Sequence, residues 1–185
     1  MAEAIEERGY RQTTIADVVR IARTSRRSFY EQFADRDACF LALFDEVHGS
    51  IMKLIASSVD AELSWEEQIN RSLALYLDTI ASRPGLSRSF AYELAALGEV
   101  GAARQRSAIE QFAELLVALV ESGQRERHER STHPLTIDMA IMIVGGMHEM
   151  TIAALERGRD VHELQAIAAK AIEAILNATV LESDR

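Results

Sequence analysis

Several residue types that mark particular fold classes are scarce in this sequence of 185 residues. Cys39 is the single cysteine, so no disulfide can form within the chain. Two prolines, Pro84 and Pro134, interrupt the sequence, aromatic residues make up 6 %, and no segment alternates β-branched with polar residues. These absences favour an all-α fold over one that contains a β-sheet.

Sequence signals for secretion and for membrane insertion are also missing. No uninterrupted apolar run approaches about 18 residues, and the N-terminus has no signal peptide. Together with the single cysteine, these features predict a reducing, cytoplasmic location and no membrane partner. Hydrophobic residues nevertheless make up 48 % of the chain, which is enough for a sizeable globular core.

The net charge of −9 is distributed unevenly along the chain. Residues 1–36 hold seven arginines and six acidic residues, whereas the rest holds thirteen basic and twenty-three acidic residues. Within residues 11–36, six arginines face three acids. Such a local surplus permits binding to DNA phosphates, while the acidic remainder discourages indiscriminate binding.

Residues 13–44 predict a helix-turn-helix, in which two short helices joined by a tight turn are followed by a longer helix. Thr14 is placed to cap the first helix with its hydroxyl. Apolar residues then recur at helical spacing at Ile15, Val18, Val19 and Ala22. After the turn at 23–25, Phe29 and Phe33 lie four residues apart and define the inner face of the second helix.

The face opposite the two phenylalanines suits DNA. Arginine can pair with phosphates or with guanine edges, and Ser, Tyr and Gln supply neutral hydrogen bonds. The candidate DNA-binding residues are Thr14, Thr24, Ser25, Arg26, Arg27, Ser28, Tyr30, Gln32 and Arg36. Among them, the candidate base readers are Arg27 and Ser28, and the candidate phosphate contacts are Thr14, Tyr30 and Arg36.

Several motifs of this segment occur together at the spacing of one known family. They are Gly9-Tyr10, Thr13-Thr14-Ile15, Ser25-Arg26-Arg27-Ser28-Phe29-Tyr30, Phe33 and Arg36-Asp37. In these motifs the chain closely resembles the DNA-binding segment of TetR-type transcriptional repressors. The resemblance covers about the first quarter of the chain and implies a dimeric regulator.

Two positions depart from the pattern of that family. The turn holds Arg23 where glycine is usual, and Arg36 stands where a lysine usually opens the fourth helix. Arg36 keeps the positive charge. Arg23 puts a side chain where free backbone conformation is expected, so it either alters the turn or adds a phosphate contact.

About nine helices are expected in all, beginning with a short helix that Gly9 ends. Asp35 is a plausible cap for a fourth helix at about residues 36–58, which would connect a DNA-binding head to the remainder. We therefore predict a helix-turn-helix domain at residues 1–45 and a ligand-binding and dimerisation domain at residues 46–185.

Caps and breakers divide the second domain into helices. Ser64 caps a fifth helix and Pro84 opens a sixth. Gly98 and Gly101 loosen the chain before a seventh helix, which Gly123 ends. A polar loop at 124–133, for which a surface extension of the seventh helix is the alternative, leads to an eighth helix from Pro134 to about Arg157, and Asp160 caps a ninth that runs to about Leu181.

The last two helices predict a homodimer. The eighth is apolar over most of its circumference, so one neighbouring helix cannot cover it. Pairing with a symmetry copy would bury both helices in a four-helix bundle, which is also how the resembled family dimerises. The candidate interface residues are Met142, Gly145, Ile172 and Ile175. The alternative is a monomer whose core these helices close.

Residues of the larger domain could surround a mostly apolar cavity for a small-molecule effector. The candidate ligand-binding residues are Tyr76, Phe90, Phe112, Met142 and His148, although the favoured interpretation of each one alone is a core residue. His-Glu pairs occur three times, but the residues four places after each histidine are Thr132, Ile152 and Ala166, so the helical zinc-protease spacing is absent. No metal site and no cofactor are expected.

The preferred interpretation is a ligand-responsive transcriptional regulator, a repressor that binds a palindromic double-stranded DNA operator as a dimer. An effector would act through the fourth helix, which belongs to both halves of the chain. The rival hypotheses are an α-helical enzyme that uses His148 and Glu149, and an interaction module in which the helix-turn-helix is only a fold element.

Overall fold

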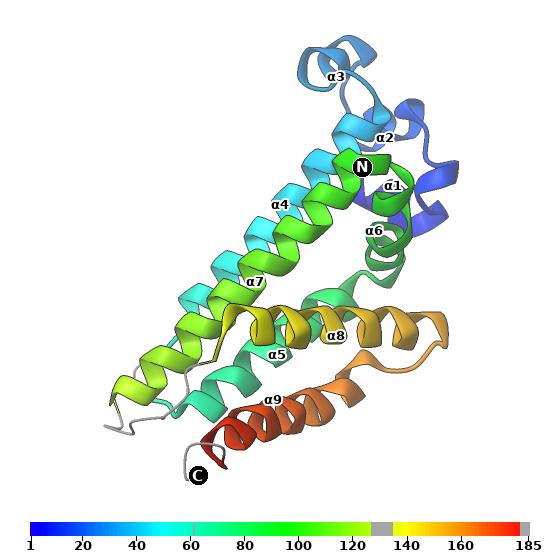
Figure 1. Ribbon diagram of the computed structural model, residues 1–185. Helices are drawn as coiled ribbons and strands as arrows, with labels where there is room; N and C mark the ends of the chain where they lie inside the picture. Colours follow the sequence, from blue (N-terminus) through cyan, green and yellow to red (C-terminus); the bar gives the residue numbers. More distant parts are fainter. Residues whose placement is uncertain (61, 127–134, 182–185) are drawn as a thin grey trace. The chain divides into compact units, whose positions relative to one another are not determined.

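Every regular element in the described part of the chain is helical, which confirms the all-α prediction. The structure, a computed structural model, describes residues 1–60, 62–126 and 135–181 (Figure 1). The elements are α1 (Ala2–Arg8), η1 (Tyr10–Gln12), α2 (Ile15–Ile21), α3 (Arg26–Gln32), α4 (Arg36–Ser57), α5 (Trp65–Ser82), α6 (Pro84–Ala96), α7 (Gly98–Glu126), α8 (Ile137–Glu156), η2 (Val161–Glu163) and α9 (Leu164–Leu181).

Several helix ends lie at the caps that the sequence predicts. The Asp35 carboxylate accepts the Ala38 amide at 2.7 Å at the start of α4. Ser64 and Glu67 form a reciprocal capping box at the start of α5. Pro84 occupies the first turn of α6. Short polar side chains thus fix where these helices begin.

Three predicted boundaries are wrong. Helix α7 begins at Gly98 and continues past Gly123 to Glu126, because one internal glycine does not end a helix whose flanking residues pack. Thr136 rather than Pro134 caps α8, its hydroxyl accepting the Met139 amide. Pro134 itself and most of the predicted loop at 124–133 lie outside the described residues.

The chain packs as two compact units. Unit 1 comprises Met1–Ser50 and Ser82–Arg106, and unit 2 comprises Ile51–Ala81 and Ser107–Arg185. The division therefore falls inside α4 and inside α7 rather than after residue 45. Helix α6, predicted in the larger domain, belongs to unit 1, where it packs against α1.

Unit 1 is built around aromatic and aliphatic side chains from α1, α4 and α6. Ile5 and Phe40 are fully buried, and the Phe40 ring lies 5.4 Å from that of Phe90. The Glu6 carboxylate accepts the amides of Gly85 and Leu86 at 3.0 and 2.8 Å, so a side chain of α1 caps the N-terminus of α6.

Gly101 lies inside α7 rather than in a loosened segment before it. It is buried, and a Cβ added there would come far inside contact distance of the Leu94 carbonyl oxygen in α6. Absence of a side chain thus allows α7 to approach the end of α6 closely.

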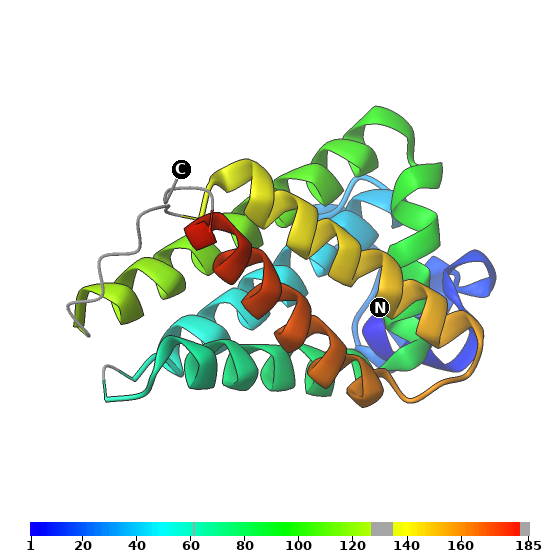
Figure 2. The ribbon, with the colours of Figure 1, turned by 60° about the horizontal axis from the view of Figure 1, so that its bottom comes forward.

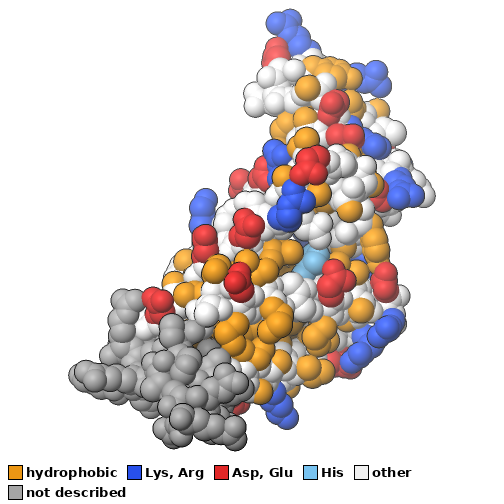
Figure 3. All heavy atoms as spheres, viewed as in Figure 1, with side chains coloured by type: hydrophobic (Ala, Val, Ile, Leu, Met, Phe, Trp, Pro, Cys, Tyr) orange, Lys and Arg blue, Asp and Glu red, His pale blue; other side chains and the backbone are white. Residues whose placement is uncertain are grey.

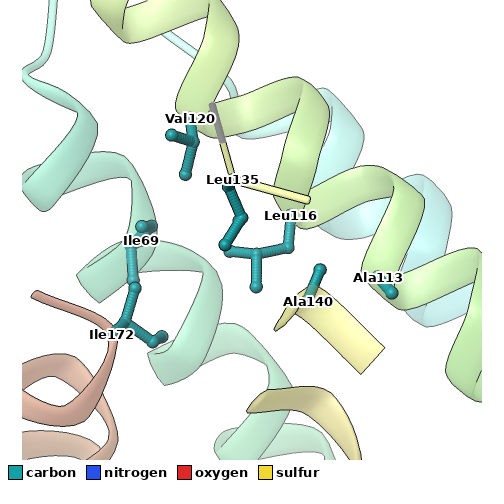
Figure 4. Close-up of a cluster of buried hydrophobic side chains, with 7 residues drawn as sticks. All are labelled: Ile69, Ala113, Leu116, Val120, Leu135, Ala140 and Ile172. Atoms are coloured by element: carbon teal, nitrogen blue, oxygen red, sulfur yellow. The ribbon is translucent and has the colours of Figure 1, made fainter. Parts of the chain in front are cut away.

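Unit 2 contains two apolar clusters formed by α5, α7, α8 and α9. In one of them, Leu135 and Leu116 point toward each other, and Ile69, Val120 and Ile172 lie around them (Figure 4). The other centres on Leu77, which is fully buried. The partly buried Leu73 packs against both clusters.

Helices α8 and α9 run side by side in both views (Figure 2), but α8 is poorly covered for its composition. It is long and apolar enough to cross a membrane, yet only 17 % of its 18-residue apolar window is buried. Soluble helices of such composition are normally covered on most sides. The large apolar side chains that α8 leaves exposed are Ile137, at 43 %, and Met142, at 60 %.

Candidate nucleic-acid interface

The N-terminus of α2 is fixed by the cap that the sequence predicts. The Asp17 amide donates to the Thr14 hydroxyl at 3.2 Å, and the Asp17 carboxylate accepts the Thr14 amide at 3.1 Å. Bonds from Thr14, followed by the charges of Arg8 and Arg20, hold the pKa of Asp17 below its usual value. The Thr14 hydroxyl is thus engaged in the cap of its own helix.

The turn after α2 is a Schellman motif. The Arg23 amide donates to the Arg20 carbonyl at 3.3 Å, and the Thr24 amide donates to the Val19 carbonyl at 3.0 Å. This pair of bonds requires a left-handed residue after the last helical position, and Arg23 has φ 50°. Of the two alternatives that the sequence left open for Arg23, the altered turn is not observed, since the turn is regular and arginine adopts the conformation usual for glycine.

Helix α3 is fixed at its start by a cap and on its inner face by a phenylalanine. The Ser25 hydroxyl accepts the Ser28 amide at 3.0 Å. Phe29 is 4 % exposed in a cluster with Val18 and Cys39, and Phe33 packs beside it with ring centroids 5.5 Å apart. This packing determines which side of α3 faces outward.

The outer face of α3 carries most of the candidate DNA contacts. Arg26, Arg27, Tyr30 and Gln32 are exposed, and Tyr30 retains 56 % of its accessible surface. Figure 3 shows Lys and Arg side chains standing out around α3. Thr24 and Ser25 are exposed in the preceding turn. In a helix-turn-helix the second helix enters the major groove, so this outer face is the one expected to meet DNA.

Two candidate base readers have partners within the chain. The Arg27 Nε donates to the Glu31 carboxylate at 3.0 Å, one helical turn away. Both side chains are more than half exposed, so this pair contributes little and can be exchanged for DNA. The Ser28 hydroxyl lies 3.0 Å from that of Ser25 and is partly buried.

Arg36 is held by the protein more firmly than its predicted phosphate contact suggests. Its Nη1 donates to the carbonyls of Thr13 and Tyr10 at 3.2 and 3.4 Å, and its guanidinium lies 4.3 Å from the Tyr10 ring centroid. The Tyr10 hydroxyl donates to Asp37, and burial is the main cause that raises the pKa of Tyr10. Arg36 therefore joins η1 to α4. The sequence did not predict this role because it depends on contacts between residues that are distant in the sequence.

The candidate ligand-binding residues do not all come together. Phe90 lies in the unit 1 core, while Met142 is 60 % exposed on α8 and lines no interior. In unit 2, Tyr76 and Phe112 meet edge to face with centroids 5.8 Å apart. Burial raises the pKa of Tyr76, opposed by a hydrogen bond with Thr151. Burial also lowers the pKa of His148, against the opposing charge of Glu149.

The candidate interface residues differ in exposure. Met142 is exposed and Gly145 and Ile175 are partly exposed, whereas Ile172 is only 3 % exposed because it packs in the core of its own unit. Ile167 on α9 is 50 % exposed and was not singled out from the sequence. Hydrophobic side chains gather on the face formed by α8 and α9 (Figure 3).

No group of three or more metal-ligating side chains is present in the described part of the chain. The nearest arrangement is His162, whose Nε2 lies 2.9 Å from Asp78 and whose Nδ1 lies 2.7 Å from Asp160. Hydrogen bonds with Asp78 and then Asp160 raise the pKa of His162. This cluster joins α5 to η2 within unit 2.

Comparison with known proteins gives a family match for the segment that contains this geometry. Residues 2–43 match the family model described as bacterial regulatory proteins, tetR family. The search of curated proteins finds no match.

Solved structures resemble the chain over most of its length. The fatty acid degradation regulator FadR from Bacillus halodurans shares 18 % identity, with a TM-score of 0.76 and 91 % of each chain covered. FadR from Bacillus subtilis, in complex with stearoyl-CoA, shares 16 % identity at a TM-score of 0.75, again with 91 % of each chain covered. A tetR-family regulatory protein from Rhodococcus RHA1 shares 17 % at 0.64, covering 95 % of this chain and 90 % of the other.

These similarities coincide with the motifs and with the geometry of α2 and α3. The structures agree in fold, and the family model covers the segment that contains the helix-turn-helix. The predicted resemblance is thereby confirmed: the chain carries the N-terminal segment of the tetR family of bacterial regulatory proteins within the all-α fold of TetR-type transcriptional regulators.

Proposed function

We propose that the chain is a cytoplasmic repressor, without enzymatic activity, that binds a palindromic double-stranded DNA operator as a homodimer. A small, mostly apolar effector in unit 2 releases it. The observation that carries this proposal is the exposed face of α3, where Arg26, Arg27 and Tyr30 stand over the buried Phe29. A helix that is merely solvated does not require an exposed face of this composition. This face also lies in a segment that matches a family of regulatory proteins.

The proposal assigns different roles to two neighbours on α3. Arg27 reads a base edge, so Arg27→Ala should cost about 1–3 kcal/mol of operator binding and relax the preference at one position. Tyr30 donates its hydroxyl to a phosphate, so Tyr30→Phe should cost about 0.5–1.5 kcal/mol on operator and random DNA alike. Fluorescence anisotropy on both DNAs at one salt concentration measures the difference.

These two variants control for each other because neither should unfold the protein. Arg27 has only an exposed ion pair, and Tyr30→Phe keeps the ring that packs edge to face on Phe29. Arg36→Ala is a poorer test, since it would also remove the bonds to Tyr10 and Thr13. If Arg27→Ala lost the same affinity for operator DNA as for random DNA, base reading by Arg27 would be contradicted.

The operator is expected to be palindromic because the proposed dimer has two-fold symmetry. The exposed apolar face of α8 and α9 supports pairing of two copies, since covering it removes apolar surface from water. Two α3 helices would then enter successive major grooves about 34–36 Å apart. The proposed interface comprises Met142, Gly145, Ile167 and Ile175, while Ile172 lies in the core of its own unit.

The proposed effector site lies inside unit 2, around the buried polar groups of α5 and α8. Tyr76 bonds Thr151 there, and Phe112 lies against the Tyr76 ring. His148 lies partly buried on α8, the helix that also carries Thr151. An apolar wall with a few polar groups is typical of small-molecule sites. FadR from Bacillus subtilis binds stearoyl-CoA, so a long-chain acyl-CoA is the first class to test.

Effector binding should stabilise the protein and weaken operator binding together. At 100 times its Kd, a ligand adds about 2.7 kcal/mol to the free energy of unfolding, or about 5–10 °C in Tm. Stearoyl-CoA is the probe and coenzyme A without an acyl chain is the control. Thermal melts and anisotropy at fixed salt measure the two effects. A ligand that raises Tm but leaves operator affinity unchanged would refute release by the effector.

Helix α4 is the proposed carrier of the signal, since it is continuous from Arg36 in unit 1 to residues of unit 2. Ile51 and Ile55 are 6 % and 4 % exposed at its second half. An effector can release DNA only through a difference in its affinity for two conformations. Ile55→Ala should therefore weaken the coupling between effector and operator. The ratio of operator affinity without effector to operator affinity with effector should fall further in Ile55→Ala than in Ile55→Val.

A further inference from the structure

One residue of the helix-turn-helix adopts a backbone conformation that its side chain disfavours. Arg23 has φ 50°, and within the described residues it is the only non-glycine with positive φ. An L-residue with a Cβ is strained there because the Cβ crowds the following carbonyl. A site that keeps such strain invites a functional explanation.

The same turn occurs elsewhere in the chain with the unstrained residue. At the end of α8, the Gly158 amide donates to the Leu155 carbonyl and the Arg159 amide donates to the Ala154 carbonyl. These are the two bonds of the turn after α2, and Gly158 has φ 63°. Glycine thus satisfies this turn without strain, and the backbone alone gives no reason for arginine at position 23.

The Arg23 side chain also has no partner in the described part of the chain. It is exposed, and no hydrogen bond or ion pair of its guanidinium is found among the described residues. Its neighbours differ, since Arg20 lies 3.7 Å from Asp17 and Arg27 lies 3.0 Å from Glu31. Arg23 is therefore an uncompensated positive charge two residues before the Ser25 cap of α3.

We propose that Arg23 is a DNA-backbone contact, whose guanidinium binds a phosphate at the edge of the groove that α3 enters. This inference rests on the proposed DNA-binding function. A turn that precedes the recognition helix lies where a duplex presents its sugar-phosphate backbone, and arginine binds phosphate through paired, charge-assisted bonds. The favourable free energy of this contact offsets the backbone strain, which glycine at position 23 would relieve.

Three variants at position 23 separate the charge from the strain. Arg23→Gly removes both. Loss of the strain should raise Tm by a few degrees. Loss of the charge should weaken binding to operator and to random DNA alike, about 5–10-fold, and lower the salt slope by about 1. Arg23→Asn, which tolerates the left-handed region, should lose the same affinity. Arg23→Lys keeps the charge, so it should keep the salt slope and gain no Tm.

Gly158→Arg is the matched control, because it places arginine in the same turn far along the chain. It should lower Tm without changing the salt slope. The assay is anisotropy from about 50 to 200 mM salt, together with thermal melts.

If the natural chain binds DNA and Arg23→Gly keeps its affinity and salt slope, the phosphate contact is overturned while the proposed function stands. If Tm does not rise, the strain argument is overturned. If the natural chain binds no DNA, both proposals fall.

Discussion

Replacing Gly101 by alanine is expected to disrupt the packing of unit 1. The added Cβ would overlap the Leu94 carbonyl oxygen, a backbone atom that cannot move aside as a flexible side chain could. Alanine gains about 1 kcal/mol in helix propensity. Overlap with backbone in a packed core costs about 3 kcal/mol or more, so the clash outweighs that gain. We expect a large drop in Tm by calorimetry or circular dichroism.

Gly49→Ala is the matched control for this substitution. Gly49 also lies inside a helix, α4, but nothing stands within 4 Å of an added Cβ. The same chemical change should therefore stabilise the chain by about 0.5–1 kcal/mol through helix propensity alone. If both variants shifted Tm alike, the close approach of α7 to α6 at Gly101 would be refuted.

Charges on the apolar face of α8 and α9 are expected to produce monomers that bind DNA weakly. Met142 and Ile167 are 60 % and 50 % exposed, so glutamate at either position is tolerated by the single chain. In the proposed dimer both charges would be buried without partners, which is strongly unfavourable. Loss of the second head should reduce operator affinity about 100-fold or more.

Light scattering and anisotropy on Met142→Glu/Ile167→Glu measure the two effects together. Ala56→Glu is the control, because it adds a glutamate at an exposed position of α4, outside the proposed interface. Circular dichroism should show unchanged helix content in both variants. A Met142→Glu/Ile167→Glu protein that remains dimeric would place the interface elsewhere.

The local features of the fold could be predicted because they are encoded by neighbouring residues. Thr14, Asp35 and Ser64 each cap a helix through the amide three positions further along the chain, so spacing alone reveals them. The inner face of α3 likewise followed from the four-residue interval between Phe29 and Phe33. These short-range patterns located the helix-turn-helix.

Features that depend on contacts between distant residues could not be predicted. The cap of α6 by Glu6 joins positions 79 and 80 residues apart, and the role of Gly101 depends on where Leu94 lies. For the same reason Phe90 was assigned to a ligand site although it packs on Phe40. An apolar residue at helical spacing shows that a face is buried, but it does not show against what.

Binding of the chain to the DNA that flanks its own gene tests the central claim most directly. Anisotropy titration at one fixed salt concentration, followed by DNase I footprinting, compares that DNA with random duplex of equal length. The account predicts binding at least 10³-fold tighter than to random DNA, over a protected inverted repeat whose half-site centres lie about 10 base pairs, or a multiple of that, apart. Equal affinity for the flanking and random duplexes, with no protected repeat, would contradict it.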